Sequence, residues 1–246
     1  MCTPADDIDL LQDFLPSTPL LYGTVAYAPR LLQFYTFLVS SPYMDVLAQY
    51  SIKGTRIGRG SVRGWYLEAN PMAVVSDAQI QAYLKGLVKA KMISPNRNSY
   101  FPIHLGPNTT VILGGLQSCR DFCGYHRSFP ISGISQTPYI YYSVIPDQSG
   151  ACYGACGTSL DPFTDLTAVS AHEFAETVVN PGWGSAKYFA SPLGWYNGYG
   201  GEIADICGSA LDTLKDSNGT AWAVEKLWSN AHGKCITQIP PSNNTY

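Results

Sequence analysis

Charged residues are scarce in this chain: they make up 13% of its 246 residues, whereas hydrophobic residues make up 46%. This composition excludes a disordered or coiled-coil protein, and the length suffices for a sizeable core. Long apolar runs are also lacking, and a predicted membrane span would need about 18 such residues. With 23 glycines and 17 prolines, the sequence indicates a globular protein rich in loops.

The N-terminal residues 1–16 lack the basic and apolar blocks of a signal peptide. Two explanations stay open: the chain is not exported, or this sequence begins after the cleavage point with an added Met. The cysteines and sequons described below favour the second. We expect residues 1–18 to form a loose, acidic leader and residues 19–246 to form a single domain.

Basic charge is too thinly spread to predict binding to nucleic acid. Residues 1–127 hold eleven Lys/Arg and eight Asp/Glu, whereas residues 128–246 hold four and ten. The Arg/Gly segment 53–64 is short and has no stacking aromatic before Trp65, so we interpret it as a solvated loop. We therefore expect neither nucleic acid nor a membrane among the partners.

Seven cysteines and three glycosylation sequons predict a secreted protein. Disulfides persist in oxidising compartments, and Asn-x-Ser/Thr sequons carry glycans on exported chains. We therefore predict an extracellular glycoprotein that is stabilised by disulfides. The sequons begin at Asn108, Asn218 and Asn243.

The cysteine spacing leaves several pairings open. Two C-x3-C pairs could form a four-thiolate zinc site, although such sites favour shorter spacings. Six cysteines permit fifteen disulfide pairings. We favour two close pairs that are linked to each other and a third bond between the last two cysteines, with Cys2 unpaired. The six are Cys119, Cys123, Cys152, Cys156, Cys207 and Cys235.

Periodicity predicts an α+β fold with a mixed sheet. The clearest amphipathic helix spans residues 76–92, where Ser76 is the N-cap and Gln79 completes a capping box. Residues 30–50 should form a helix that breaks at Pro42. Loop is expected at 146–164, and strands at 20–27, 61–69, 100–105, 109–115, 138–145 and near 221–228.

One predicted helix carries charges in an apolar setting. The segment SAHEFAETVVNPGW, residues 170–183, follows apolar residues and ends at a proline, so we expect a buried helix over residues 166–179. His172 and Glu176 are four residues apart and share one face, whereas Glu173 lies about 100° round the helix. Buried carboxylates are costly unless a cation pairs with them.

The sequence offers two kinds of cation for these carboxylates. From residue 128 to residue 214, Lys187 is the only Lys or Arg, against eight acidic residues. Arg59, Arg63 or Arg127 from the first half could reach in. A divalent metal meets the same need and also uses the histidine, because H-E-x-x-E has the spacing of the H-E-x-x-H zinc helix.

Further candidate ligands lie outside this helix. Glu202 and Asp205 sit in the segment GYGGEIADIC without a basic neighbour, and many zinc hydrolases take a third ligand from a later segment. His126 follows a cysteine pair, so a disulfide could fix it as a ligand or as a supporting group. His104 and His232 lack such companions, and we interpret both as structural or exposed.

Four motifs occur in the order seen in a known family. They are SCRDFCGYH, TAVSAHEFAETVVNPGW, GGEIADIC and EKLWSNAHGKC, and the segments LLYGTVAY and SSPYMDVLAQY match the N-terminal half. From about residue 20 to residue 237, the chain resembles the EXORDIUM or phosphate-induced family of secreted proteins. It resembles microbial members more than plant members, through CGYH and its C-terminal motif. The resemblance implies secretion and disulfides, and does not by itself establish catalysis.

Together these observations predict a zincin-like α+β domain with one divalent metal, for which zinc is the first choice. We expect His172 and Glu176 to be ligands, Glu202 the third, and His126 the next choice. Asp205 is either a ligand or the carboxylate that orients an imidazole. Glu173 would be the general base that activates a metal-bound water. The predicted function is that of a secreted metallohydrolase acting on a peptide or protein, with a cleft lined by Trp183, Trp195, Tyr196 and Tyr199.

Two alternatives stay open. In one, the protein is a non-catalytic extracellular protein whose metal is structural and whose aromatic loop binds cell-wall polysaccharide. A structural zinc is closed by four protein ligands, whereas a catalytic zinc keeps a position for water, and the sequence supplies enough donors for either. In the other, there is no metal, and Arg63 or Arg127 pairs with the glutamates.

Overall fold

The computed structural model describes residues 16–17, 20–22, 25, 27–52, 56–68, 71–135, 137–157, 159, 161–182, 193–199 and 201–241. Its α-helices are α1 (Ala28–Leu38), α2 (Tyr43–Ala48), α3 (Asp77–Lys89) and α4 (Pro162–Val179), with 3-10 turns η1 (Gly150–Cys152) and η2 (Asp205–Cys207). The strands are β1 (Pro16–Ser17), β2 (Leu20–Tyr22), β3 (Ser61–Val62), β4 (Tyr66–Glu68), β5 (Val74–Ser76), β6 (Tyr100–Leu105), β7 (Thr110–Leu113), β8 (Leu116–Gln117), β9 (Tyr125–Pro130), β10 (Tyr139–Ile145), β11 (Leu211–Lys215), β12 (Ala221–Glu225), β13 (Leu227–Ser229) and β14 (Lys234–Ile236).

The main sheet is mixed, as the sequence predicts. Its strands run in the order β3-β1-β6-β10-β9, with β2 pairing β4 and β6. Strands β6 and β10 are parallel, whereas β9 is an antiparallel edge strand. All six residues of β6 are buried, which is typical of a strand covered on both faces. Three smaller sheets complete the α+β fold.

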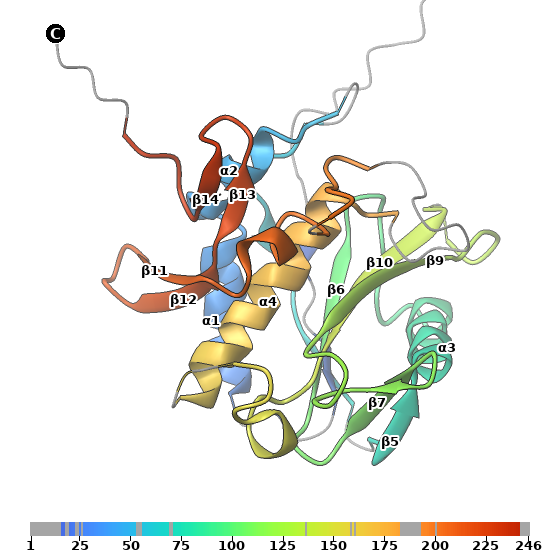
Figure 1. Ribbon diagram of the computed structural model, residues 1–246. Coiled ribbons are helices and arrows are strands. Elements are labelled where there is room, and N and C mark those ends of the chain that lie inside the picture. The colour runs from blue at the N-terminus through green and yellow to red at the C-terminus, as the bar shows by residue number, and fades with distance from the viewer. Residues whose placement is uncertain are drawn as a thin grey trace, which may run out of the picture.

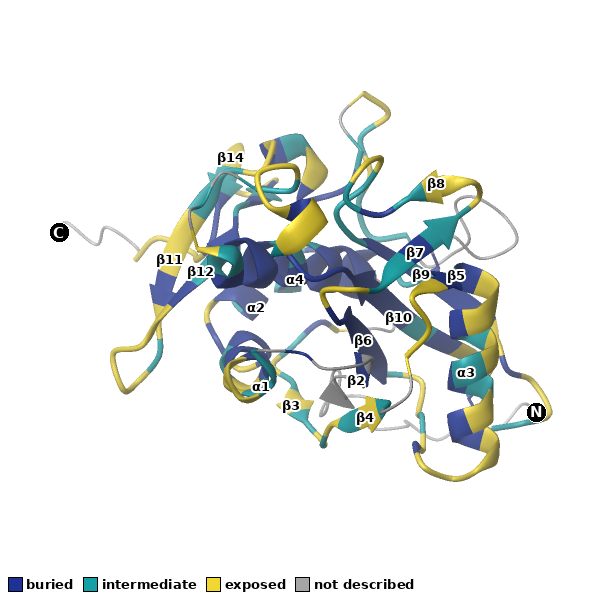
Figure 2. Cartoon of the chain, turned by 90° about the horizontal axis from the view of Figure 1, so that it is seen from below, coloured by how far each residue is buried: buried dark blue, intermediate teal, exposed yellow. Residues whose placement is uncertain are grey.

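Helix α4 lies between the main sheet and the C-terminal strands (Figure 1). It packs on β10, β9 and β6 on one side and on β12 on the other. It is buried over most of its length, whereas α3 has an exposed side (Figure 2). The two faces of the sheet cover separate cores: one is built around α1, α2 and α4, and the other around α3, β7 and β9.

Local sequence signals explain where the helices begin and end. The capping box of Ser76 and Gln79 is confirmed at the start of α3. The break at Pro42 is also confirmed, because α1 ends at Leu38 and α2 begins at Tyr43. Helix α4 begins four residues earlier than expected, because Asp161 caps it and Pro162 occupies its first turn. It ends at Val179, before Pro181.

The structure confirms the favoured disulfide pairing. The two C-x3-C pairs are linked to each other through Cys119–Cys152 and Cys123–Cys156. The third bond joins Cys207 to Cys235 and ties η2 to β14. Cys2 lies outside the described residues. The four-thiolate zinc alternative is therefore wrong, because all four sulfurs are used in disulfides.

Six strands lie outside the predicted strand ranges, and one of them, β1, belongs to the expected leader. Strands β5, β8, β9, β11 and β14 lie where no strand is predicted, and β9 carries His126. Residues 16–17, assigned to the leader, pair with β3 and β6 as β1; the leader before them is outside the described residues.

Of the three sequon asparagines, Asn108 and Asn218 are exposed, and Asn243 is not described. Within the described part of the chain, no helix is long and apolar enough to cross a membrane.

Candidate metal centre

Helix α4 carries a histidine and a glutamate that meet on one face. His172 and Glu176 are one turn apart, and the distance from His172 Nε2 to Glu176 Oε2 is 3.1 Å. The side chain of Glu176 is only 4% exposed, whereas that of His172 is 18% exposed. The i, i+4 spacing thus places one donor atom inside the protein and a second donor nearer the surface.

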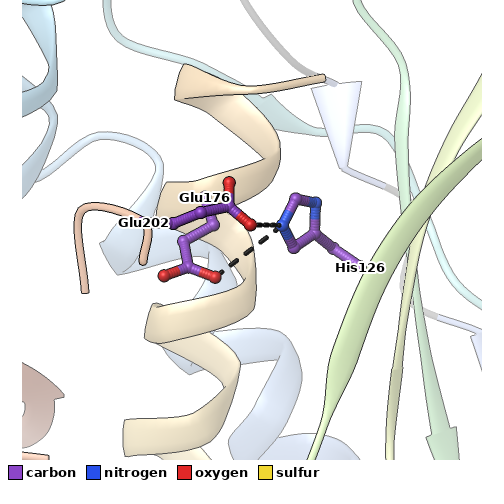
Figure 3. A group of neighbouring side chains, drawn as sticks. All are labelled: His126, Glu176 and Glu202. Carbon is purple, nitrogen blue, oxygen red and sulfur yellow. Dashed lines mark hydrogen bonds and ion pairs between the residues drawn. The ribbon is translucent and has the colours of Figure 1, made fainter. Parts of the chain in front are cut away.

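Two residues from distant parts of the chain complete the group (Figure 3). His126 reaches in from β9, and its Nε2 lies 3.0 Å from Glu202 Oε2 and 3.7 Å from Glu176 Oε2. His126, Glu176 and Glu202 are all buried. His172, Glu173 and Glu176 form a second group that shares Glu176, and each group brings its donor atoms within 4.8 Å of one another. We call the first the inner group and the second the cleft group.

The second oxygen of each glutamate in the inner group accepts hydrogen bonds from other parts of the protein. Glu176 Oε1 accepts hydrogen bonds from the backbone N–H groups of Ala204 and Asp205, each at 3.2 Å. Asn180 Nδ2 donates to Glu202 Oε1 at 2.5 Å. The remaining oxygens, Oε2 of Glu176 and Oε2 of Glu202, both face His126. Such support is typical of metal ligands, whose orientation is fixed by neighbouring groups.

The carboxylate that orients His172 is Glu225, which the sequence analysis missed. Glu225 Oε2 lies 2.8 Å from His172 Nδ1, so Nε2 is left for the interior of the site. Asp205, the predicted candidate for this role, lies 3.4 Å from Nε2 instead. Its other oxygen accepts the backbone N–H of Glu202 at 3.0 Å. Asp205 is therefore placed on the donor side of the imidazole, not on the supporting side.

Two sequence signals could have identified the missed residues. Glu225 ends the otherwise apolar strand β12 and is 5% exposed, so its charge needs a partner. Asn180, the C-cap residue of α4, is fully buried and bonded to Glu202 and to the backbone around Trp195. Each is a buried polar residue in an apolar stretch, which is the pattern that pointed to Glu173 and Glu176.

Two of the three arginines considered as cations make ion pairs elsewhere. Arg127 lies 3.0 Å from Asp77, and Arg59 pairs with Asp45. Arg63 lines a separate cleft beside Trp65. Among the described residues, no Lys or Arg makes an ion pair with Glu173 or Glu176, and the neighbouring histidines are the cationic groups present.

The histidine pKa values reflect this excess of carboxylates. Burial lowers the pKa of His126, but the hydrogen bond to Glu202 and the charges of three glutamates outweigh it and raise the pKa to about 9. The pKa of His172 is also raised: burial opposes the shift, and Glu176, Asp205 and Glu225 cause it. Without another cation, both imidazoles hold protons to neutralise the site.

Glu173 differs from the other carboxylates because its side chain has no hydrogen-bond partner among the described residues. It is 5% exposed, and burial raises its pKa, an effect that the nearby histidines oppose and the neighbouring glutamates reinforce. Gly124 permits this position, since a Cβ there would lie 2.7 Å from Glu173 Oε1. The carboxylate is thus enclosed beside the donor atoms without being tied to any of them.

The cleft group borders an open cleft of about 560 Å³. His172 and Glu173 line this cleft, together with Asp205 and Glu225, whereas the inner residues His126 and Glu202 are not among its lining. We call the inner group and the cleft group together the donor cluster. The cleft therefore gives a ligand access to one side of this cluster.

The aromatic residues proposed for substrate binding lie in different environments. Trp195 packs against Tyr50, with ring centroids 6.4 Å apart, and its indole N–H donates to Asn230. Tyr196 is 36% exposed, and neither residue lines the cleft beside His172. Trp183 lies outside the described residues.

The remaining histidines fit the structural interpretation. His104 is fully buried, bonds Tyr35 and has a pKa lowered by burial to about 3, while His232 bonds Ser229.

Comparisons with protein-family models, curated proteins and solved structures found no match to this chain. The chemistry of the site therefore has to be inferred from its own residues.

Proposed function

We propose that the donor cluster binds one divalent metal ion, with zinc the first choice. His126, Glu176 and Glu202, the inner group, are the three ligands, which leaves a fourth position for water. His172 lies next to them on the cleft side. Imidazole and carboxylate donors suit zinc. Ligands about 2.1 Å from a tetrahedral zinc lie roughly 3.4 Å apart, and His126 Nε2 lies 3.0 Å from Glu202 Oε2 and 3.7 Å from Glu176 Oε2. The ion would neutralise the buried carboxylates.

The protein is then a metal-dependent hydrolase whose substrate is a peptide or protein. The observation that carries this proposal is Glu173, a buried carboxylate without a hydrogen-bond partner in the described residues, beside the donor atoms and at the cleft. Bound zinc supplies Lewis acidity, which polarises a carbonyl group and makes water more acidic. Glu173 accepts the proton of the attacking water and returns it to the leaving amine. His172, oriented by Glu225, borders the position of the substrate carbonyl.

The wider setting supports an extracellular, zincin-like enzyme. A helix that carries the donors packs on a mixed sheet, and the antiparallel edge strand of that sheet carries His126. Three disulfides suit an oxidising compartment, and two sequons lie in exposed positions where a glycan fits. We propose that the chain is a secreted glycoprotein and a member of the EXORDIUM or phosphate-induced family that it resembles.

A structural metal is the second candidate. Four donors, His126, His172, Glu176 and Glu202, are connected by contacts of 3.0–3.7 Å, and four protein ligands would close a zinc site. In that case the protein is a non-catalytic extracellular protein whose aromatic loop binds wall polysaccharide. In the hydrolase Glu173 is the general base, whereas in the structural candidate Glu173 has no catalytic role.

A broad peptide-library digest separates these candidates. Zinc-loaded wild type is expected to cleave peptides, and protein stripped with a chelator is expected to cleave none until zinc is restored. If zinc-loaded protein retains its metal and cleaves nothing in the library, the hydrolase proposal fails and the structural one stands.

The stabilising effect of the metal should increase with pH. The pKa of His126 is raised from its ordinary 6.5 to about 9, so its proton stabilises metal-free protein below pH 6.5, and that stability is lost as pH rises toward 9. Metal ligands must be deprotonated, so zinc binds more tightly over the same range. The test is the melting temperature with zinc and with chelator at pH 6, 7.5 and 9. If the difference between the melting temperatures with zinc and with chelator shrinks as pH rises, the ligand role of His126 is contradicted.

Removing the Cys207–Cys235 bond should weaken both the fold and the metal site. Loss of a disulfide costs about 2–5 kcal/mol, and this one anchors η2, next to Glu202. A double Ala variant at these cysteines is expected to bind zinc less tightly. The comparison variant removes Cys119–Cys152, which closes a loop of similar length and does not involve the segment that carries Glu202. Urea unfolding and zinc titration are the measurements, and equal zinc affinities in the two variants would refute the anchoring role.

A further inference from the structure

The cleft beside the cleft group extends along α4 to a second buried carboxylate. Asp165, Val169, His172 and Glu173 all line it, and their spacing of three and four residues places them on one side of the helix. Asp165 precedes His172 by seven residues, which corresponds to roughly 10 Å along the helix axis. The cleft thus joins the donor cluster at one end to Asp165 at the other.

Asp165 is short of partners for its charge. It is 3% exposed, and the backbone N–H of Ser159 donates to its Oδ1 at 3.3 Å. Within the described residues, no hydrogen bond or ion pair reaches Oδ2. Burial raises its pKa, as expected for a carboxylate whose charged form lacks a cation. Its place in the first turn of α4 is favourable, but a helix N-terminus adds only modest stabilisation.

The walls around Asp165 are built from small residues. Gly157 presses against the carboxyl group, because a Cβ there would lie 2.1 Å from Asp165 Cγ. Gly157 follows Cys156, so the Cys123–Cys156 disulfide fixes this wall. Further lining residues are Gly124, Gly154, Ala155 and Ala168. Backbone and small side chains therefore border this end of the cleft, which we call the slot.

Four of the five titratable groups that line the cleft are carboxylates. Its titratable lining consists of Asp165, Glu173, Asp205 and Glu225 together with His172, and none of the described lining residues is Lys or Arg. Glu225 is bonded to His172, and Asp205 is bonded to the backbone of Glu202. Of the two remaining carboxylates, Glu173 stands beside the donor cluster, so Asp165 is the one available to a ligand at the far end.

We infer that this slot binds the basic side chain of a peptide, with its ammonium or guanidinium group paired to Asp165. A lysine side chain reaches roughly 6 Å from its Cα. An adjacent backbone carbonyl would then lie at the end of the cleft that His172 and Glu173 border. The inference rests on the proposed function in treating this peptide as the substrate, whereas the binding of a basic group stands independently.

Calorimetry with N-acetylarginine amide and its uncharged citrulline analogue tests the binding. Wild type is expected to bind the arginine compound roughly 10–100-fold more tightly, and Asp165→Asn should lose that preference. Asp161→Asn is the matched control: it removes a carboxylate from the same helix end, retains a capping side chain, and does not line the cleft. Equal binding of the two compounds by wild type would overturn the inference, whether or not Asp165→Asn folds.

The peptide-library digest separates this inference from the proposed function. Cleavage next to Lys or Arg that Asp165→Asn reduces by roughly 10–100-fold, with other peptides unaffected, supports both. Cleavage without any preference for basic residues leaves the hydrolase standing and overturns the basic slot. Tight arginine binding without cleavage of any peptide supports the slot and contradicts the hydrolase.

Discussion

Replacing Glu173 by glutamine is expected to leave the metal bound and to lower peptide hydrolysis by about 10²–10⁴-fold. Glutamine keeps the size of the side chain but cannot accept a proton from water. Stability should not fall, because the carboxylate has no hydrogen-bond partner among the described residues, and burial disfavours its charge. A loss of activity without a loss of metal or stability is the signature of a general base.

The measurements are kcat/KM on a cleaved peptide, metal content and melting temperature of Glu173→Gln beside wild type. Activity within a few-fold of wild type would remove Glu173 from the chemistry. A variant that loses both metal and stability would show instead that Glu173 holds the ion, as its place in the cleft group permits.

Replacing Glu176 by glutamine is expected to have the opposite effect on the metal. Glu176 Oε2 faces both histidines, so a neutral amide there is a much weaker ligand. Its Oε1 bonds to the backbone of Ala204 and Asp205 can be kept by glutamine, so the local chain is not expected to rearrange. Most of the metal should be lost, and the free energy of unfolding should fall by about 3–5 kcal/mol relative to metal-loaded wild type.

The two glutamine variants are matched controls for each other, because the same change is made three residues apart on one buried helix. Elemental analysis and thermal unfolding of both variants are the measurements. Full metal retention in Glu176→Gln would contradict its assignment as a ligand, whatever the activity of either variant.

Much of the site could be predicted because its signals are local in sequence. Helix α4 was identified from its apolar residues and the following proline, and its H-E-x-x-E spacing named three of the clustered side chains. Glu202 and His126 were named as further candidates, and both lie in the inner group. The disulfide arrangement that was favoured among several open pairings is also present.

The remaining features depend on long-range packing. No strand was predicted around His126, yet this residue lies on β9, whose position is set by pairing with β10 and not by a strong local pattern. Glu225 approaches His172 because β12 packs on α4, a contact between segments about fifty residues apart. No periodicity in the sequence encodes such a contact.

The hydrogen bonds of the side chains distinguish Glu173 from Glu176, which the sequence alone could not do. Glu173 and Glu176 look alike in the sequence, and helix geometry alone gave them different roles. The structure adds the reason: Glu176 is held by two backbone N–H groups, whereas Glu173 has no such bond in the described residues and faces the cleft. Asp165 was not singled out at all, because an acidic residue in the first turn of a helix is common.

Elemental analysis of protein purified without added metal tests the central claim most directly. The account predicts about one divalent metal ion per chain, bound tightly enough that zinc added after chelation raises the melting temperature. The contradicting result is protein that contains no divalent metal and whose melting temperature does not change with zinc. The contacts of His126 and His172 with Glu176 would then be ion pairs of protonated histidines, and the site would hold no metal.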